Sequence, residues 1–274
     1  MSGENWHSLY IPTGEREAQD VARTLREALI ACGYQPYDPF PGGSGLSAVG
    51  WTERVRHFVA PVRQGWMRVL GQPDRQALPL LAATLGGPLL HAWLEGEAGG
   101  VTVWTAEGAN ESAAALEPWR RADCPAEALA RALNGSLEAA DAPLEPDIPL
   151  PAEMQALARS VDPAQARRLI DRLTRTVFDK LGGADPAIRA GAMALLPGGP
   201  AWASAGGRRL QAVMACLCVP QDWRWPDERD LLAAYQVARA RQHRPDGLRL
   251  PGDDEALARL PEALDYLPVY AGRR

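Results

Sequence analysis

Two short apolar runs, separated by a break, constrain the fold of this chain more than any other feature of the sequence. They lie within Arg56–Leu70 and are rich in Val, Phe, Trp and Met, and the break falls at Pro61–Gly65. Neither run is long enough for a helix of ordinary length, and this composition between Pro and Gly residues is typical of paired strands. The sequence therefore predicts a β-hairpin over residues 56–70.

The segments on either side of this hairpin predict further strands and two helices. Leu9–Ile11 is a short apolar run. Apolar positions recur every three or four residues in Glu15–Ala31 and in Arg75–Leu85, which predicts helices. A second strand pair is expected at Leu89–Glu95 and Val101–Thr105, joined by a Gly-rich turn. The order strand, helix, strand, strand, helix, strand, plus one extra strand, is that of the ferredoxin-like split βαβ fold, so the predicted class is α+β.

Composition divides the chain into three regions. Residues 1–106 hold the α+β elements, and residues 107–150 are interpreted as a connecting region, because Ala142–Pro151 has four prolines in ten residues. Such a run is extended and stiff. Residues 151–274 carry several helix starts, such as Asp162-Pro163, followed by amphipathic runs. An all-helical second domain is therefore predicted, and its apolar tail Leu264–Tyr270 is expected to pack back on the body.

The overall composition is that of a globular protein. The chain has 274 residues, of which 46% are hydrophobic, and a net charge of −5. No run approaches the roughly 20 apolar residues that a membrane span needs. The first twenty residues lack the basic start and the apolar run of a signal peptide. A cytoplasmic location is therefore expected.

The cysteines are expected to be free thiols, mostly buried as small apolar residues. They form no C-x-x-C pair and are too few for a chain of this size to depend on disulfides. Two of them lie two residues apart in a segment that reads as helical, which would place them on different faces and disfavours a mutual bond. The four are Cys32, Cys124, Cys216 and Cys218.

Period-two alternation along the expected strands separates two faces of the sheet. One face would carry Leu9, Ile11, Met67 and Val69, with Leu90, Ala92 and Leu94, and would pack against the two helices. The other face would be aromatic and basic rather than plainly polar, and such a face needs a cover. The candidate interaction surface consists of Tyr10, His57, Trp66, Arg68, His91, Trp93 and Trp104, with Phe58 in place of His57 if the register differs by one residue.

No motif in the sequence names a reaction, a cofactor or a metal. The four histidines lack H-x-x-x-H and H-E-x-x-H spacing, and no G-x-S-x-G sequence occurs. Gly42–Gly45 resembles a phosphate loop in composition, but no Lys-Ser or Lys-Thr pair follows it. We therefore expect no catalytic, cofactor-binding or metal-binding residues.

Three kinds of binding partner or chain segment are considered as the cover of this aromatic face. They are the rest of the same chain, a partner protein or second copy, and a stacked ligand or single-stranded nucleic acid. The leading hypothesis is a non-enzymatic interaction or regulatory protein that uses this face and the loop Pro39–Gly50. The alternative is an enzyme or small-ligand binder whose pocket between two domains contains His57, Arg68 and His91. Nucleic acid is disfavoured, because residues 1–150 carry a net charge of −8.

Overall fold

The computed structural model describes residues 5–39, 50–134, 202–243, 245, 247 and 250–274. Three expectations lie outside these residues: most of the loop Pro39–Gly50, the Pro-rich stretch and the helices predicted between residues 162 and 196. The chain divides into two compact units. One comprises residues 1–5, 94–100 and 130–215, and the other comprises residues 6–93, 101–129 and 216–274.

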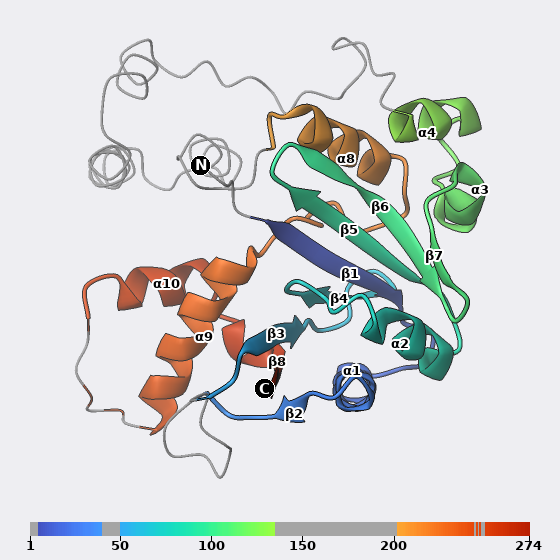
Figure 1. Cartoon of the computed structure of the whole chain (residues 1–274). Helices are drawn as coiled ribbons and strands as arrows, with labels where there is room; N and C mark the ends of the chain where they lie inside the picture. The colour runs from blue at the N-terminus through green and yellow to red at the C-terminus, as the bar shows by residue number, and fades with distance from the viewer. Residues whose placement is uncertain (1–4, 40–49, 135–201, 244, 246, 248–249) are drawn as a thin grey trace, which may run out of the picture. The chain divides into compact units, whose positions relative to one another are not determined.

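The structure is α+β, with eight strands in one sheet in the order β2-β8-β3-β4-β1-β5-β6-β7 (Figure 1). The pairs β1–β4, β3–β4, β3–β8, β2–β8 and β6–β7 are antiparallel. The strands are β1 (Trp6–Pro12), β2 (Gln35–Pro36), β3 (Glu53–Val59), β4 (Trp66–Leu70), β5 (Leu89–Glu95), β6 (Ala98–Thr105), β7 (Gly108–Asn110) and β8 (Leu267–Arg273).

The predicted hairpin is confirmed as β3 and β4. Phe58 pairs with Leu70 in an antiparallel register, and the intervening turn has positive φ angles at Gln64 and Gly65. Glycine adopts such a φ without steric cost, which is why it suits this turn. The backbone N–H and the hydroxyl of Thr13 both donate hydrogen bonds to the Gly65 carbonyl. The turn is therefore fixed to the end of β1.

Helices α1 (Ala18–Ala31) and α2 (Ala77–Leu85) pack on one core cluster with strand residues such as Leu9, Met67 and Val69. Pro79 lies in the first turn of α2, where N–H groups have no acceptor inside the helix, so the proline costs little. Helix α2 begins at Ala77, two residues after the predicted start at Arg75. Gly86 ends α2 in the left-handed conformation.

The last strand, β8, corrects the expectation that residues 151–274 are all helical. It pairs with β3 along its whole length, with His57 opposite Val269. Val269 and Ala271 belong to the α1–α2 core, whereas Tyr270 packs in a second cluster with Phe58. The apolar tail thus packs on the body as expected, but as a strand buried on both faces rather than as a helical extension.

The second cluster covers the sheet face opposite α1 and α2. It is formed with helix α9 (Glu228–His243) and with Leu260, the residue that follows helix α10 (Asp253–Arg259). Leu231 and Tyr235 of α9 pack with Phe58 and Leu70, and the Phe58 and Tyr235 rings meet edge to face with 5.3 Å between centroids. Both faces of this part of the sheet are therefore covered by the chain itself.

Three helices remain to be described, α3, α4 and α8, and α8 makes a close backbone contact. Helices α3 (Ala113–Leu116) and α4 (Ala126–Leu133) follow β7, with the 3-10 turn Glu117–Trp119 between them. Helix α8 (Ala205–Ala215) meets the β5–β6 turn, where the Gly206 N–H donates to the Glu97 carbonyl at 2.9 Å. A Cβ on Gly206 would lie 2.3 Å from that oxygen, so only glycine fits here.

Candidate functional site

The seven residues of the predicted interaction surface do not share one face of the sheet. Tyr10, Trp66 and Arg68 lie on the face opposite α1 and α2, because their neighbours Leu9, Met67 and Val69 belong to the α1–α2 core. The other four residues, His57, His91, Trp93 and Trp104, lie on the face that packs against α1 and α2. The expectation of one continuous aromatic face is therefore wrong in this respect.

The register of β5 and β6 accounts for the difference. Leu89 and Trp104 pack with the α1–α2 core, so by alternation His91 and Trp93 also face that side. The Trp93 indole N–H donates to Thr102 at 3.3 Å, which places Thr102 there as well. Leu90, Ala92 and Leu94, which were expected on the helix side, therefore face the opposite side.

Tyr10 and Trp66 are covered by a segment from the C-terminal part of the same chain. The Trp66 indole N–H donates to the Cys218 carbonyl at 2.6 Å, and the Tyr10 hydroxyl donates to the Trp223 carbonyl. Burial raises the pKa of Tyr10 to about 12, so its phenol stays neutral near neutral pH. These rings are anchors for residues 218–223 and are not available to a partner.

Two of the candidate residues are buried histidines that stay uncharged. Burial lowers the pKa of His57 to about 4, and burial followed by the nearby His7 lowers the pKa of His91 to about 3. The His7 and His91 rings stack, with 3.2 Å between His7 Nδ1 and His91 Nε2. His57 is fully buried in β3, and Arg68 lies on the other face of the sheet. His57, Arg68 and His91 therefore do not form one polar site.

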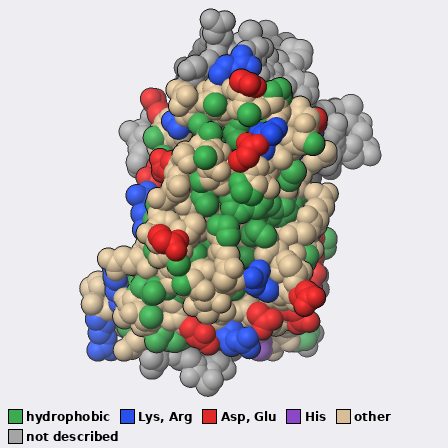
Figure 2. Space-filling model, turned by 90° about the vertical axis from the view of Figure 1, so that its right-hand side faces the viewer, with side chains coloured by type: hydrophobic (Ala, Val, Ile, Leu, Met, Phe, Trp, Pro, Cys, Tyr) green, Lys and Arg blue, Asp and Glu red, His purple; other side chains and the backbone are tan. Residues whose placement is uncertain are grey.

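A groove near the end of the sheet was missed by the sequence reasoning. Its volume is about 360 Å³, and it lies against β6 and β7 and the α3 segment. Figure 2 views the side of the molecule that carries α2, β7 and α3, and shows hydrophobic side chains gathered across its middle. The lining residues are Pro88, Val103, Thr105, Glu107, Gly108, Ala109, Asn110, Ala115, Pro118 and Trp119.

The groove is mostly apolar, with polar side chains at Thr105, Glu107 and Asn110. Among the described residues that line it, Glu107 is the ionisable one, and a hydrogen bond with Thr105 lowers the pKa of this carboxyl group, which is therefore ionised at neutral pH. The centroid of the Trp119 ring lies 6.4 Å from that of Trp66, so the groove lies next to the covered ring of Trp66. The signal that could have found it is the short β7 strand after a two-residue turn, followed by the sequence Glu-Pro-Trp.

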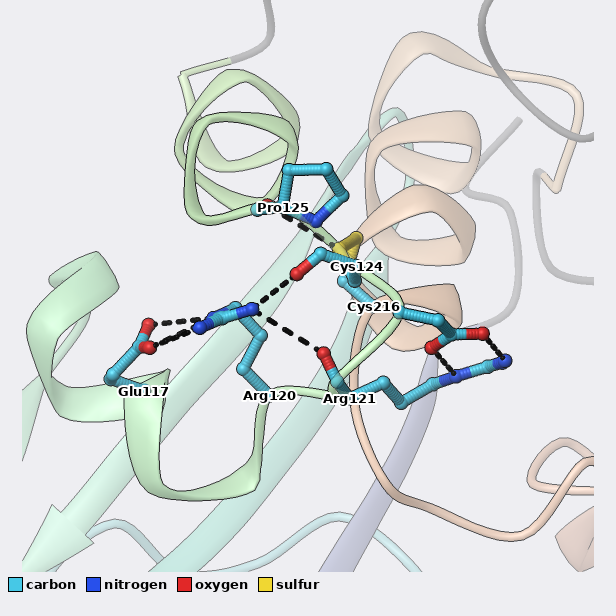
Figure 3. The surroundings of a disulfide bond; sticks show 7 residues. Glu117, Arg120, Arg121, Cys124, Pro125 and Cys216 are labelled. Atoms are coloured by element: carbon cyan, nitrogen blue, oxygen red, sulfur yellow. Dashed lines mark hydrogen bonds and ion pairs between the residues drawn. A yellow bond between two sulfur atoms is a disulfide. The ribbon is translucent and has the colours of Figure 1, made fainter.

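A disulfide joins Cys124 to Cys216, which corrects the expectation of four free thiols. Helix α8 ends at Ala215, so Cys216 lies outside the helix in which it was expected, and the next residue, Leu217, forms an isolated antiparallel bridge with Arg120. Arg120 lies between the Glu117 carboxylate and the Cys124 carbonyl and bonds to both (Figure 3). Cys32 and Cys218 are free, and Cys218 is exposed.

The described part of the chain contains neither a metal cluster nor a membrane span. No group of three or more His, Cys, Asp or Glu side chains is placed to hold a metal ion there. Within the same residues, no helix combines the length and the apolar character that crossing a bilayer requires.

Comparison with known proteins gives no relative. No family model matches the sequence, and no curated protein or solved structure is significantly similar to it.

Proposed function

We propose that this chain is a non-enzymatic protein-interaction module that binds a partner protein in the groove beside β7. The supporting observation is the combination of an apolar groove with the outermost strand of the sheet. An extended peptide can add to such an edge by main-chain hydrogen bonds while alternate side chains enter pockets next to it. The proposed binding surface is thus the groove beside β7 and no longer the aromatic sheet face that the sequence predicted.

The chemistry of the groove favours one kind of occupant. A binding site for a small polar metabolite usually carries several convergent polar groups, whereas seven of the ten described residues that line this groove are apolar or glycine, and Glu107 is the charged one among them. Trp119 and the two prolines offer flat apolar contacts. The partner segment is therefore extended, inserts an apolar side chain between Val103 and Trp119, and carries a basic residue opposite Glu107.

A selection experiment tests this proposal. Short random peptides displayed on phage are selected on the whole chain, and enriched peptides are measured against Ala115→Glu, which places a charge in the groove. The matched control is Ala233→Glu on the exposed side of α9. We expect apolar-basic peptides whose affinity falls at least about tenfold for Ala115→Glu and is unchanged for Ala233→Glu. Absence of enrichment, or equal binding to both variants, contradicts the proposal.

We also propose that the central elements form a ferredoxin-like unit. The support is the strand order β3-β4-β1-β5, the antiparallel pairs β1–β4 and β3–β4, and the packing of α1 and α2 in one cluster. Strands β2 and β8 extend this sheet at one edge, and β6 and β7 extend it at the other. The division at residues 107–150 stays a prediction, because residues 135–201 lie outside the described chain.

The cytoplasmic location also stays a prediction, and the disulfide is an observation against it. Disulfides such as Cys124–Cys216 persist mainly in oxidising environments. Alkylation of the protein in growing cells before lysis tests the location. Four alkylated cysteines are expected for a reducing compartment, and two alkylated cysteines, Cys32 and Cys218, contradict it.

A further inference from the structure

Arg68 is a buried cation, and its hydrogen-bond and ring contacts with the described residues are all with neutral groups. Its side chain is 7% exposed. Nε donates to the Ser8 hydroxyl at 2.8 Å, Nη2 donates to the Arg224 carbonyl at 3.3 Å, and the guanidinium lies 5.5 Å from the Trp6 ring centroid. Nη1 is buried without a hydrogen-bond partner among the described residues. A buried charge is costly unless an opposite charge lies close to it.

A small cavity lies beside this guanidinium. Its volume is about 30 Å³, and Arg68 lines it together with Arg63, Trp66, Trp223, Trp225 and Tyr266. A cavity of this size holds one small ion or one or two water molecules, and excludes a larger organic anion. Trp66 and Tyr266, which line the cavity, are buried, whereas Trp225 on another side of it is 42% exposed.

The ionisable neighbours of the cavity do not neutralise Arg68. Asp222 also lines it, but its carboxylate is paired with Arg63 at 3.0 Å, and Arg63 bonds to Glu262 as well. Burial raises the pKa of Tyr10 and of Tyr266, so both phenols are neutral near neutral pH. In the described part of the chain no carboxylate lies within salt-bridge distance of Arg68.

We propose that this cavity is a binding site for one small monovalent anion of chloride size, held by Arg68 Nη1. The anion supplies the charge that the buried guanidinium lacks. Binding also stabilises the cover of the sheet, because Trp223 and Arg224 belong to the segment whose carbonyls bond to Tyr10 and Arg68. The site is independent of the groove beside β7.

Anion-dependent thermal stability tests this proposal on the whole chain. The melting temperature is measured in sodium chloride and in sodium gluconate at equal ionic strength, since gluconate is too large for the cavity. We expect the melting temperature to rise with chloride in the manner of a saturable ligand, with bromide acting similarly. Equal melting temperatures in chloride and gluconate would overturn the proposal, and this comparison needs no variant.

Substitutions then assign the effect to Arg68. Arg68→Met is expected to weaken the apparent chloride affinity at least about tenfold. Arg16→Met is the matched control, because Arg16 also bonds to backbone carbonyls, and it should keep the chloride effect. Asp222→Asn should keep or strengthen it. A chloride effect that survives Arg68→Met, or that appears only in Asp222→Asn, contradicts the assignment.

A spectroscopic readout covers the case in which Arg68→Met does not fold. Trp66, Trp223 and Trp225 line the cavity, so bromide bound there quenches their fluorescence at close range. In the wild-type protein we expect a saturable quenching component that chloride displaces and gluconate does not. Linear quenching alone, without displacement by chloride, overturns the proposal.

Discussion

His57 makes the folded chain sensitive to acid. Its pKa in the folded protein is about 4, below the value of about 6.5 for an unfolded chain, because burial disfavours the charged ring. Between these pH values the unfolded state binds a proton that the folded state does not. The contribution of neutral His57 to the free energy of unfolding is therefore complete above about pH 6.5 and is lost as the pH falls toward 4.

We predict that His57→Leu makes the protein more resistant to acid. The wild-type chain should lose up to about 3 kcal/mol of unfolding free energy through His57 between neutral pH and pH 4, and the variant should not. Urea unfolding at a series of pH values measures this. The loss from His91 remains in both proteins, so it serves as an internal reference. An identical pH dependence of the two chains would contradict the prediction.

At the scale of elements, α8 depends on a single glycine. A Cβ on Gly206 would lie 2.3 Å from the Glu97 carbonyl oxygen and 2.4 Å from the Gly99 nitrogen, and backbone atoms cannot turn aside. We predict that Gly206→Ala lowers the unfolding free energy by about 1–3 kcal/mol and increases hydrogen exchange in α8. Gly87→Ala is the control, since nothing lies within 4 Å of its Cβ position. Unchanged exchange in Gly206→Ala would show that the contact is not close.

The disulfide connects segments that are far apart in the sequence. Cys124 and Cys216 are separated by 92 residues, so their bond restricts a long loop in the unfolded chain. We predict that Cys124→Ser lowers the unfolding free energy by about 2–5 kcal/mol. Cys218→Ser, which removes an exposed free thiol, should change it by less than about 0.5 kcal/mol. Equal stability of Cys124→Ser and wild type in the absence of reductant would contradict this.

Sequence periodicity identified most elements but not the faces of every strand. It located the hairpin, α1, α2 and the strand pair β5–β6 because their apolar residues are bounded by Pro and Gly. Periodicity assigned the wrong face to the side chains of β5, because Leu89 and Leu90 are adjacent and both buried. Alternation assigns a face only when one side of the strand is polar. Strand β8 was missed for the same reason, since Val269 and Tyr270 are buried on opposite faces.

At the scale of the whole molecule, contacts between distant segments decided the candidate site. The aromatic residues Tyr10 and Trp66 were identified correctly as rings that need a cover, and the cover is the segment that contains Cys218 and Trp223. Their partners are backbone carbonyls, which carry no side-chain signal in a sequence. The groove depends on how α3 and its 3-10 turn return to β6 and β7, which also leaves no periodic pattern.

The most direct test of the proposed binding groove is an amide chemical-shift map of the chain with a selected peptide. We predict that the largest shifts fall on Gly108, Ala109 and Ala115 and on the indole N–H of Trp119, with little change in α9. We also predict that Ala115→Glu removes these shifts. Shifts concentrated on α9 or α10, or a map that Ala115→Glu leaves unchanged, would contradict the claim that this chain binds its partner beside β7.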